Sequence, residues 1–148
     1  MINVRDPYEG VVLCHLIKPD DPIEVTEIGD KLGHFCLNED IFLLVKYSSR
    51  NRSPWRFTFQ PDDIETLVND HNRGGLFGGS YVCLVCGLNS LCALREKEWS
   101  TLFDLGGREE QQTITVCRHP RTSFEVAGSA GQLEQKIPIS RFPSLLFE

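Results

Sequence analysis

Cysteine and histidine are the side chains in this sequence whose spacing could hold a metal ion. Cys83 and Cys86 have the C-x-x-C spacing of a zinc half-site, and Cys92 or His34 could complete it. The pair lies within an apolar run typical of a buried strand, where side chains three positions apart point to opposite faces of the sheet. The strand and the metal interpretations therefore compete. We expect buried, reduced cysteines and no cofactor, with a zinc-stabilised module that uses His34, Cys83, Cys86 and Cys92 as an alternative.

A lysine at the end of an apolar run is the second candidate for chemistry. Lys46 follows the apolar run at residues 41–45, and a strand, a helix and a buried strand are expected after it. This order resembles the core of the restriction-endonuclease-like PD-(D/E)XK superfamily over roughly residues 23–86. The resemblance implies that acids on and before the strand hold Mg²⁺, and that the lysine positions or activates water.

The triplet that matches this family's motif is Leu44-Val45-Lys46, so a leucine occupies the position of the acid. Asp30 could replace the family's earlier aspartate, whereas Asp40 at the hairpin fits less well. The resemblance thus implies either a degenerate site or a Mg²⁺-dependent nuclease with a migrated acid that uses Asp30 and Lys46. The simpler interpretation is a lysine whose charged end reaches solvent from the end of a strand.

Residues 46–56 form the most positive stretch of the chain, with four cations, two aromatic residues and no acid. Arginine can contact phosphate and tryptophan can stack on bases, so this stretch could bind an anion or nucleic acid together with a second basic loop after residue 117. The candidate residues are Lys46, Arg50, Arg52, Trp55, Arg56, Arg118 and Arg121. The simpler interpretation, which we favour, is a solvated hairpin loop with Trp55 in the core.

The composition limits the class of protein. The chain has 148 residues, of which 41% are hydrophobic, and a net charge of −6. This length fits a single domain, residues 1–148, that can bury a core without metal or disulfides. The negative charge gives no general attraction to nucleic acid. No segment approaches the roughly 20 apolar residues that span a bilayer, and the N-terminus lacks a secretory apolar region, so we expect no membrane partner and a cytoplasmic location.

Apolar patterns predict the secondary structure. Strands are expected at residues 11–17, 23–28, 34–37, 41–47, 55–59, 81–86, 91–94, 113–117, 123–127 and 133–139, the last at a sheet edge. Helices are expected at residues 61–72 and 96–105, the first with Pro61 in its opening turn and Gly74 and Gly75 after its end. The strand at 55–59, the helix after it and the strand at 81–86 could form a right-handed crossover with parallel pairing. The sequence therefore predicts one α+β domain with a mixed, mostly antiparallel sheet and two short helices.

No complete catalytic constellation is present in the sequence. There is no G-x-S-x-G motif, and the glycine-rich loop at residues 73–80 runs from a helix into a strand, the wrong direction for a phosphate-binding loop. We therefore expect a non-catalytic binding module that acts through a protein or nucleic-acid partner. Leu76 and Phe77 in the glycine-rich loop are candidates for a partner contact, and self-association through the apolar tail at 142–147 or an edge strand is one form of it.

Overall fold

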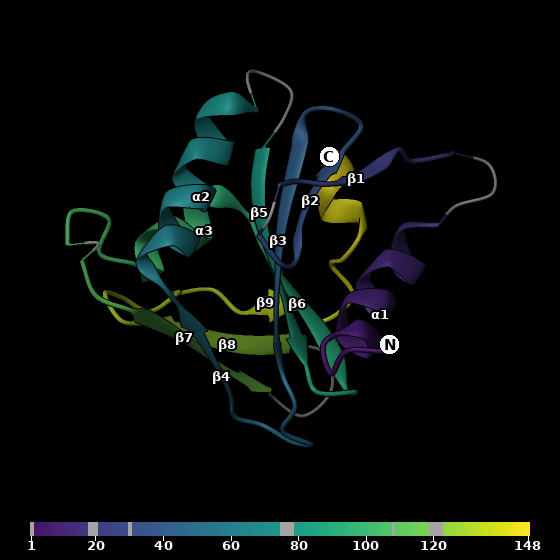
Figure 1. Ribbon diagram of the computed structural model, residues 1–148. Helices are drawn as coiled ribbons and strands as arrows, with labels where there is room; N and C mark the ends of the chain where they lie inside the picture. The colour runs from purple at the N-terminus through teal and green to yellow at the C-terminus, as the bar shows by residue number, and fades with distance from the viewer. Residues whose placement is uncertain (1, 18–20, 30, 75–78, 108, 119–122) are drawn as a thin grey trace.

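The computed structural model describes residues 2–17, 21–29, 31–74, 79–107, 109–118 and 123–148 (Figure 1). Its helices are α1 (Asp6–Leu16), α2 (Pro61–Arg73), α3 (Glu96–Leu102) and the 3-10 helix η1 (Ser144–Phe147). Its strands are β1 (Val25–Glu27), β2 (His34–Leu37), β3 (Ile41–Ser48), β4 (Trp55–Phe59), β5 (Gly79–Cys86), β6 (Ser90–Leu94), β7 (Gln112–Arg118), β8 (Ser123–Gly128) and β9 (Ile137–Pro138). The hairpins and α2 match their sequence predictions closely, whereas α3 and β9 are shorter than expected.

The strands form two sheets. Sheet A has five strands in the order β1-β2-β3-β5-β6, and sheet B has four in the order β4-β7-β8-β9. Every pairing is antiparallel except that of β3 with β5, so the α+β class with mostly antiparallel pairing is confirmed. The expected parallel pairing of β4 with β5 is wrong. The parallel partner of β5 is β3, whereas β4 belongs to sheet B and pairs with β7. The alternating burial of β4 suits a sheet with one solvated face, whereas β3 and β5 are covered on both faces.

The predicted strand at residues 11–17 is wrong, since this segment belongs to helix α1 and raises the number of α-helices from the expected two to three. Pro7 lies in the first turn, where its missing N–H costs nothing. Val12 and Leu16 are buried on one face of the helix at a spacing of four residues. The apolar run of this segment fits a buried strand equally well, because a short apolar run does not separate the two structures.

Apolar side chains form two buried clusters, one on each face of sheet A. On one face, α1 and the C-terminal segment cover the sheet, with Val12, Leu43 and Leu145 among the buried residues. On the other face, α2, α3 and the inner side of sheet B pack against it around Leu84, Trp99 and other buried residues. Figure 1 shows this layering, with α2 and α3 on one side of β3 and β5, and α1 and the C-terminus on the other. Sheet A is therefore the central layer.

Sheet B has a buried inner face and an exposed outer face. Trp55, Phe57 and Phe59 of β4 are buried, while Arg56 and Thr58 between them are exposed. The buried residues of β7 and β8 alternate with more exposed ones in the same way. An antiparallel sheet with this pattern packs on the core with one face and meets water with the other.

The C-terminal tail docks on the body of the domain. Phe142, Leu145 and Leu146 are buried against sheet A. The short strand β9 pairs only with β8 and places Pro138 at the edge of sheet B, which is the expected position for a proline. No helix in the described part of the chain has the length and apolar character needed to cross a bilayer.

Candidate functional site

The basic loop between β3 and β4 lies beside Arg118, the one residue of the second basic stretch that belongs to the described residues. Arg50 and Arg52 belong to the connection between β3 and β4, and Arg118 is the last residue of β7. The backbone N–H of Arg118 donates a hydrogen bond to Ser53 Oγ at 2.9 Å. The guanidinium of Arg118 also donates to the side chain of Asn89, in the turn between β5 and β6. We call Arg50, Arg52 and Arg118 the arginine surface.

Trp55 holds the loop that carries Arg50 in place. Its side chain is only 1% exposed, and its indole Nε1–H donates to the carbonyl oxygen of Arg50 at 2.9 Å. Gly87 packs against the same carbonyl, has a positive φ of 58°, and a side chain there would collide with Arg50. The favoured interpretation, with Trp55 in the core, agrees with this burial, and Trp55 is removed from the candidates for stacking on bases because its ring anchors the loop instead.

The arginine surface carries uncompensated positive charge. Several other cations pair with carboxylates, as Arg5 does with Glu9 at 2.9 Å and Arg141 with Glu98 at 2.8 Å. Within the described ranges, no carboxylate forms an ion pair with Arg50, Arg52, Arg118 or Arg56. Arg56 lies farther along β4 on the outer face of sheet B, and Arg121 lies outside the described residues.

Lys46 has a different environment from these arginines. Its Nζ lies 2.7 Å from Asp63 Oδ2, and it also sits 5.4 Å from the centre of the Phe59 ring. Lys31 contacts the other oxygen of Asp63 at 2.7 Å. The Asp63 carboxylate in addition accepts the backbone N–H of Gln60 at 2.8 Å, in the capping box at the start of α2. This cluster of two lysines and one aspartate therefore fastens α2 to sheet A.

The contacts of Asp63 determine its ionisation. Burial alone would raise its pKa, but hydrogen bonds from Lys31, Lys46 and the Gln60 backbone outweigh burial and hold the pKa below the ordinary value of 3.8. The carboxylate thus stays ionised at neutral pH with its oxygens already engaged. Asp30, the expected partner of Lys46 in a nuclease site, lies outside the described residues.

The cysteine and histidine candidates do not converge. Cys83 belongs to the buried cluster under α1, whereas Cys86 and Cys92 belong to the cluster on the opposite face of sheet A. Burial raises the pKa of all three thiols, that of Cys86 to about 12. His34 is engaged elsewhere, with Nε2 2.6 Å from Asp70 Oδ2 in a buried pair. In the described portion of the chain, no three potential metal ligands of these types form a group, which argues against the zinc alternative.

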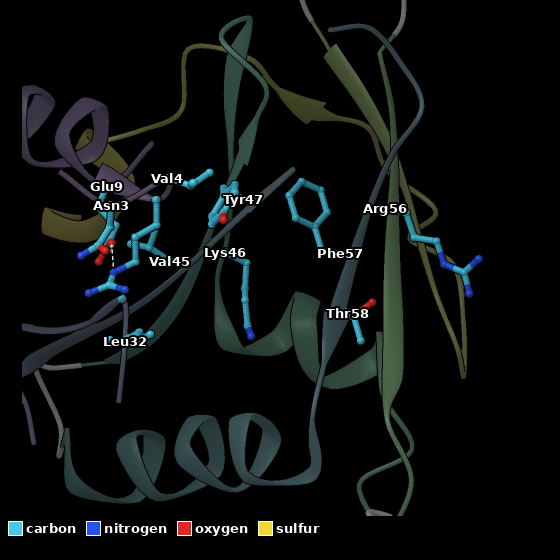
Figure 2. Close-up of a pocket in the computed structure, with 12 residues that line it drawn as sticks. Asn3, Val4, Glu9, Leu32, Val45, Lys46, Tyr47, Arg56, Phe57 and Thr58 are labelled. Carbon is cyan, nitrogen blue, oxygen red and sulfur yellow. Dashed lines mark ion pairs between the residues drawn. The ribbon is translucent and has the colours of Figure 1, made fainter. Parts of the chain in front are cut away.

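A groove of about 620 Å³ opens where sheets A and B separate (Figure 2). Val45, Lys46 and Tyr47 of β3 line one wall, and Arg56, Phe57 and Thr58 of β4 line the other. The N-terminal residues Asn3, Val4, Arg5 and Glu9 close one side. Figure 2 shows Phe57 directed between the two walls, while Arg56 extends from the opposite side of β4. In sequence, the residues of the groove walls flank those of the arginine surface, but the two sites share no residue.

Comparison with protein families, curated proteins and solved structures finds no match to this chain. The functional argument therefore rests on the geometry of its own residues.

Three features of these sites have no counterpart in the sequence predictions. They are the pairing of Asp63 with two lysines, the buried pair of His34 with Asp70, and the groove. Asp63 is explained locally by its place in the first turn of α2, so its long-range partners left no separate signal. The change from the continuous apolar run of β3 to the alternating pattern of β4 is the one signal that could have indicated the groove.

Proposed function

We propose that this protein is a non-catalytic binding module that takes a nucleic acid on the arginine surface. The observation that carries the proposal is the hydrogen bond between the Arg118 backbone and Ser53, which joins the end of β7 to the basic loop between β3 and β4. Arginines on adjoining segments that meet no carboxylate among the described residues are suited to the spaced phosphates of a nucleic-acid backbone. In a chain of net charge −6, such a surface is the local exception to the overall charge.

The proposed contact is with the phosphate backbone rather than with bases. Trp55, one of the two aromatic residues within residues 46–56, is buried. Tyr47 is 39% exposed, but its ring is stacked on Tyr8 with ring centres 4.4 Å apart. Because reading a sequence requires contacts to base edges and stacking requires a free ring, the binding is expected to be independent of sequence and steeply dependent on salt.

The test compares two double variants by fluorescence anisotropy on labelled single- and double-stranded DNA and RNA. Arg50→Ala with Arg52→Ala should weaken binding at least about tenfold at low salt, because two phosphate contacts are lost. Lys97→Ala with Lys136→Ala removes the same charge from exposed sites elsewhere and should have little effect. Equal affinities of the two double variants, or no binding by the wild type at low salt, would contradict the proposal.

A second candidate is a Mg²⁺-dependent nuclease related to the family that the sequence resembles. The observation that favours it is the 2.7 Å contact of Lys46 with Asp63, since a migrated acid requires a carboxylate beside this lysine. The two lysines that already neutralise Asp63 speak for a structural role of the same contact. Cleavage of DNA or RNA with Mg²⁺ or Mn²⁺ that is lost in Lys46→Ala would favour the nuclease, and absence of cleavage would remove it.

A further inference from the structure

We infer that the groove between β3 and β4 binds an extended peptide of alternating acidic and apolar residues, which pairs with the free edge of β4. This inference does not depend on the proposed nucleic-acid binding, because the groove and the arginine surface share no residue. The partner is a protein segment, and its recognition combines backbone pairing with side-chain contacts.

The groove exposes strand edges rather than strand faces. Successive side chains of a strand point to opposite faces, so a cavity beside one face touches every second residue. This groove instead touches three residues in a row on each wall, residues 45–47 and residues 56–58. Only the edge of a strand presents consecutive residues in this way.

Both walls lack a partner strand on the side of the groove. β4 is the first strand of sheet B and pairs only with β7. The pairing of β3 with β2 ends at Leu44, and Val45 makes one further hydrogen bond to Gly33 at 2.8 Å. Beyond that point, no described strand pairs with residues 46–48 on the β2 side. Alternate residues of β4 therefore turn their N–H and C=O groups toward the groove.

The dimensions of the groove suit a short strand. β4 has five residues, which corresponds to about 17 Å of edge. A volume of about 620 Å³ lies within the range of roughly 300–1,000 Å³ that holds small ligands. The N-terminal residues 3–5 and Glu9 wall one side, so a folded sheet edge could not approach β4 as freely as a single extended segment.

The charges of the lining residues select the partner. Arg5, Lys46 and Arg56 are the cations of the groove, and Glu9 is its one acid among the described lining residues. Arg5 is paired with Glu9 and Lys46 with Asp63, whereas Arg56 meets no carboxylate in the part of the chain that the structure describes. A strand added to β4 would place an acidic side chain beside Arg56 on the outer face of sheet B.

The inner side of the added strand meets a different surface. Phe57 alternates with Arg56 along β4 and points between the walls in Figure 2, but its ring is only 2% exposed and already packs in the core. The apolar surface that the groove offers to a partner side chain is that of Val4, Leu32 and Tyr47, which are 75%, 56% and 39% exposed. A strand added to β4 would thus alternate between the outer face beside Arg56, where an acidic residue fits, and the groove, where an apolar residue fits. A second copy of this chain that pairs through the same strand is the poorer occupant, because it would bring a second Arg56, rather than an acid, to this edge.

The experiment uses a capped, fluorescently labelled peptide of alternating Glu and Val, long enough to span β4. Its affinity is measured by anisotropy, and the amide hydrogen exchange of the protein is followed by NMR. The peptide should bind saturably and slow the exchange of alternate amides in β4. A peptide with Lys in place of Glu, and a Glu-Val peptide N-methylated at every residue, should each bind at least about tenfold more weakly, because one loses the charge match and the other loses the backbone donors.

Two charge-reversal variants separate this site from the arginine surface. Arg56→Glu should weaken the Glu-Val peptide at least about tenfold, whereas Arg50→Glu should leave it unchanged and weaken nucleic acid instead. Absence of peptide binding overturns the inference, as does equal binding of the N-methylated peptide. Peptide binding that depends on Arg50, or exchange that slows only outside β4, would also overturn it without bearing on the nucleic-acid result.

Discussion

Sheets A and B differ in burial, because sheet A is covered on both faces and sheet B on its inner face alone. Sheet A is covered by helices and the C-terminal segment on one face and by α2, α3 and sheet B on the other. Sheet B is covered on its inner face alone. Consequently, nearly every side chain of β5 is committed to packing, while every second residue of β4 is free to meet a partner.

The cations of the two regions differ in the same sense. Lys46, on the sheet that is covered on both faces, is fixed by Asp63. Arg50 and Arg52 in the loop before β4, and Arg118 at the end of β7, meet no carboxylate among the described residues, and Arg56 on β4 meets none either. Residue type alone would assign all of these cations to one basic cluster. In the structure, Lys46 is paired with a carboxylate that fastens α2 to sheet A, whereas the arginines meet no carboxylate among the described residues.

The largest contrast between buried and exposed regions is expected in thiol reactivity. With a pKa of about 12, Cys86 is ionised to about one part in ten thousand at pH 8, and it is also buried. Cys83, Cys86 and Cys92 should therefore react with an aromatic disulfide reagent at least about a thousandfold more slowly than the exposed Cys14. The measurement is time-resolved labelling followed by mass spectrometry, with denatured protein as the control. Uniform labelling rates in the native protein would contradict the burial of sheet A.

Replacement of a buried side chain of sheet A and of an exposed side chain of sheet B by alanine should lower the free energy of unfolding by different amounts. Leu84 lies in β5 and is fully buried, so Leu84→Ala should lower the free energy of unfolding by about 2–5 kcal/mol. Thr58→Ala, at an exposed position of β4, should change it by less than about 1 kcal/mol. Urea denaturation of both variants provides the comparison, and similar losses would mean that the exposed face of sheet B contributes more to the fold than its burial indicates.

The Asp63 cluster should produce a smaller effect with a defined pH dependence. Asp63→Asn should cost roughly 1.5–3 kcal/mol at pH 7, since charged hydrogen bonds to Lys31 and Lys46 are lost. Because the pKa of Asp63 is lower in the folded state, its stabilisation is full above the ordinary value of 3.8 and is lost as the pH falls through the folded pKa. Wild-type stability should thus decrease more steeply below about pH 4 than that of Asp63→Asn.

The neighbouring Asp62 provides the control for this prediction. Its side chain is 74% exposed and contacts only Lys31 among the lysines of the cluster. Asp62→Asn should therefore cost less than about 1 kcal/mol at pH 7. Parallel pH profiles for wild type and Asp63→Asn would show that Asp63 does not have the lowered pKa on which the prediction rests.

The elements of the fold could largely be predicted from local patterns, whereas their pairing could not. The alternation in β4 and the proline and acids at the start of α2 are signals within a few residues, and the elements they predict are present. The exception is α1, whose apolar run fits either structure until its tertiary contacts are known. Which strand lies beside β5 depends on contacts between distant segments, so element order led to β4 where the structure has β3.

The candidate sites follow the same division. The sequence indicated the arginines, since their density is a local property, and it also indicated that Cys83 and Cys86 point to opposite faces. It did not distinguish Lys46 from its basic neighbours, because Asp63 lies 17 residues away. It favoured the core for Trp55 and kept a ligand contact as the alternative, and the burial of the ring, which depends on tertiary packing, agrees with the core.

The most direct test of the proposed function is the salt dependence of nucleic-acid binding by the wild type and by Arg50→Ala with Arg52→Ala. Each lost phosphate contact should reduce the slope of log K against log salt by about 0.9 on duplex DNA, so the double variant should have a slope smaller by about 1.8. That result would assign the two arginines to phosphate contacts. Equal slopes and equal affinities would contradict the account, because the arginine surface would then have no part in binding.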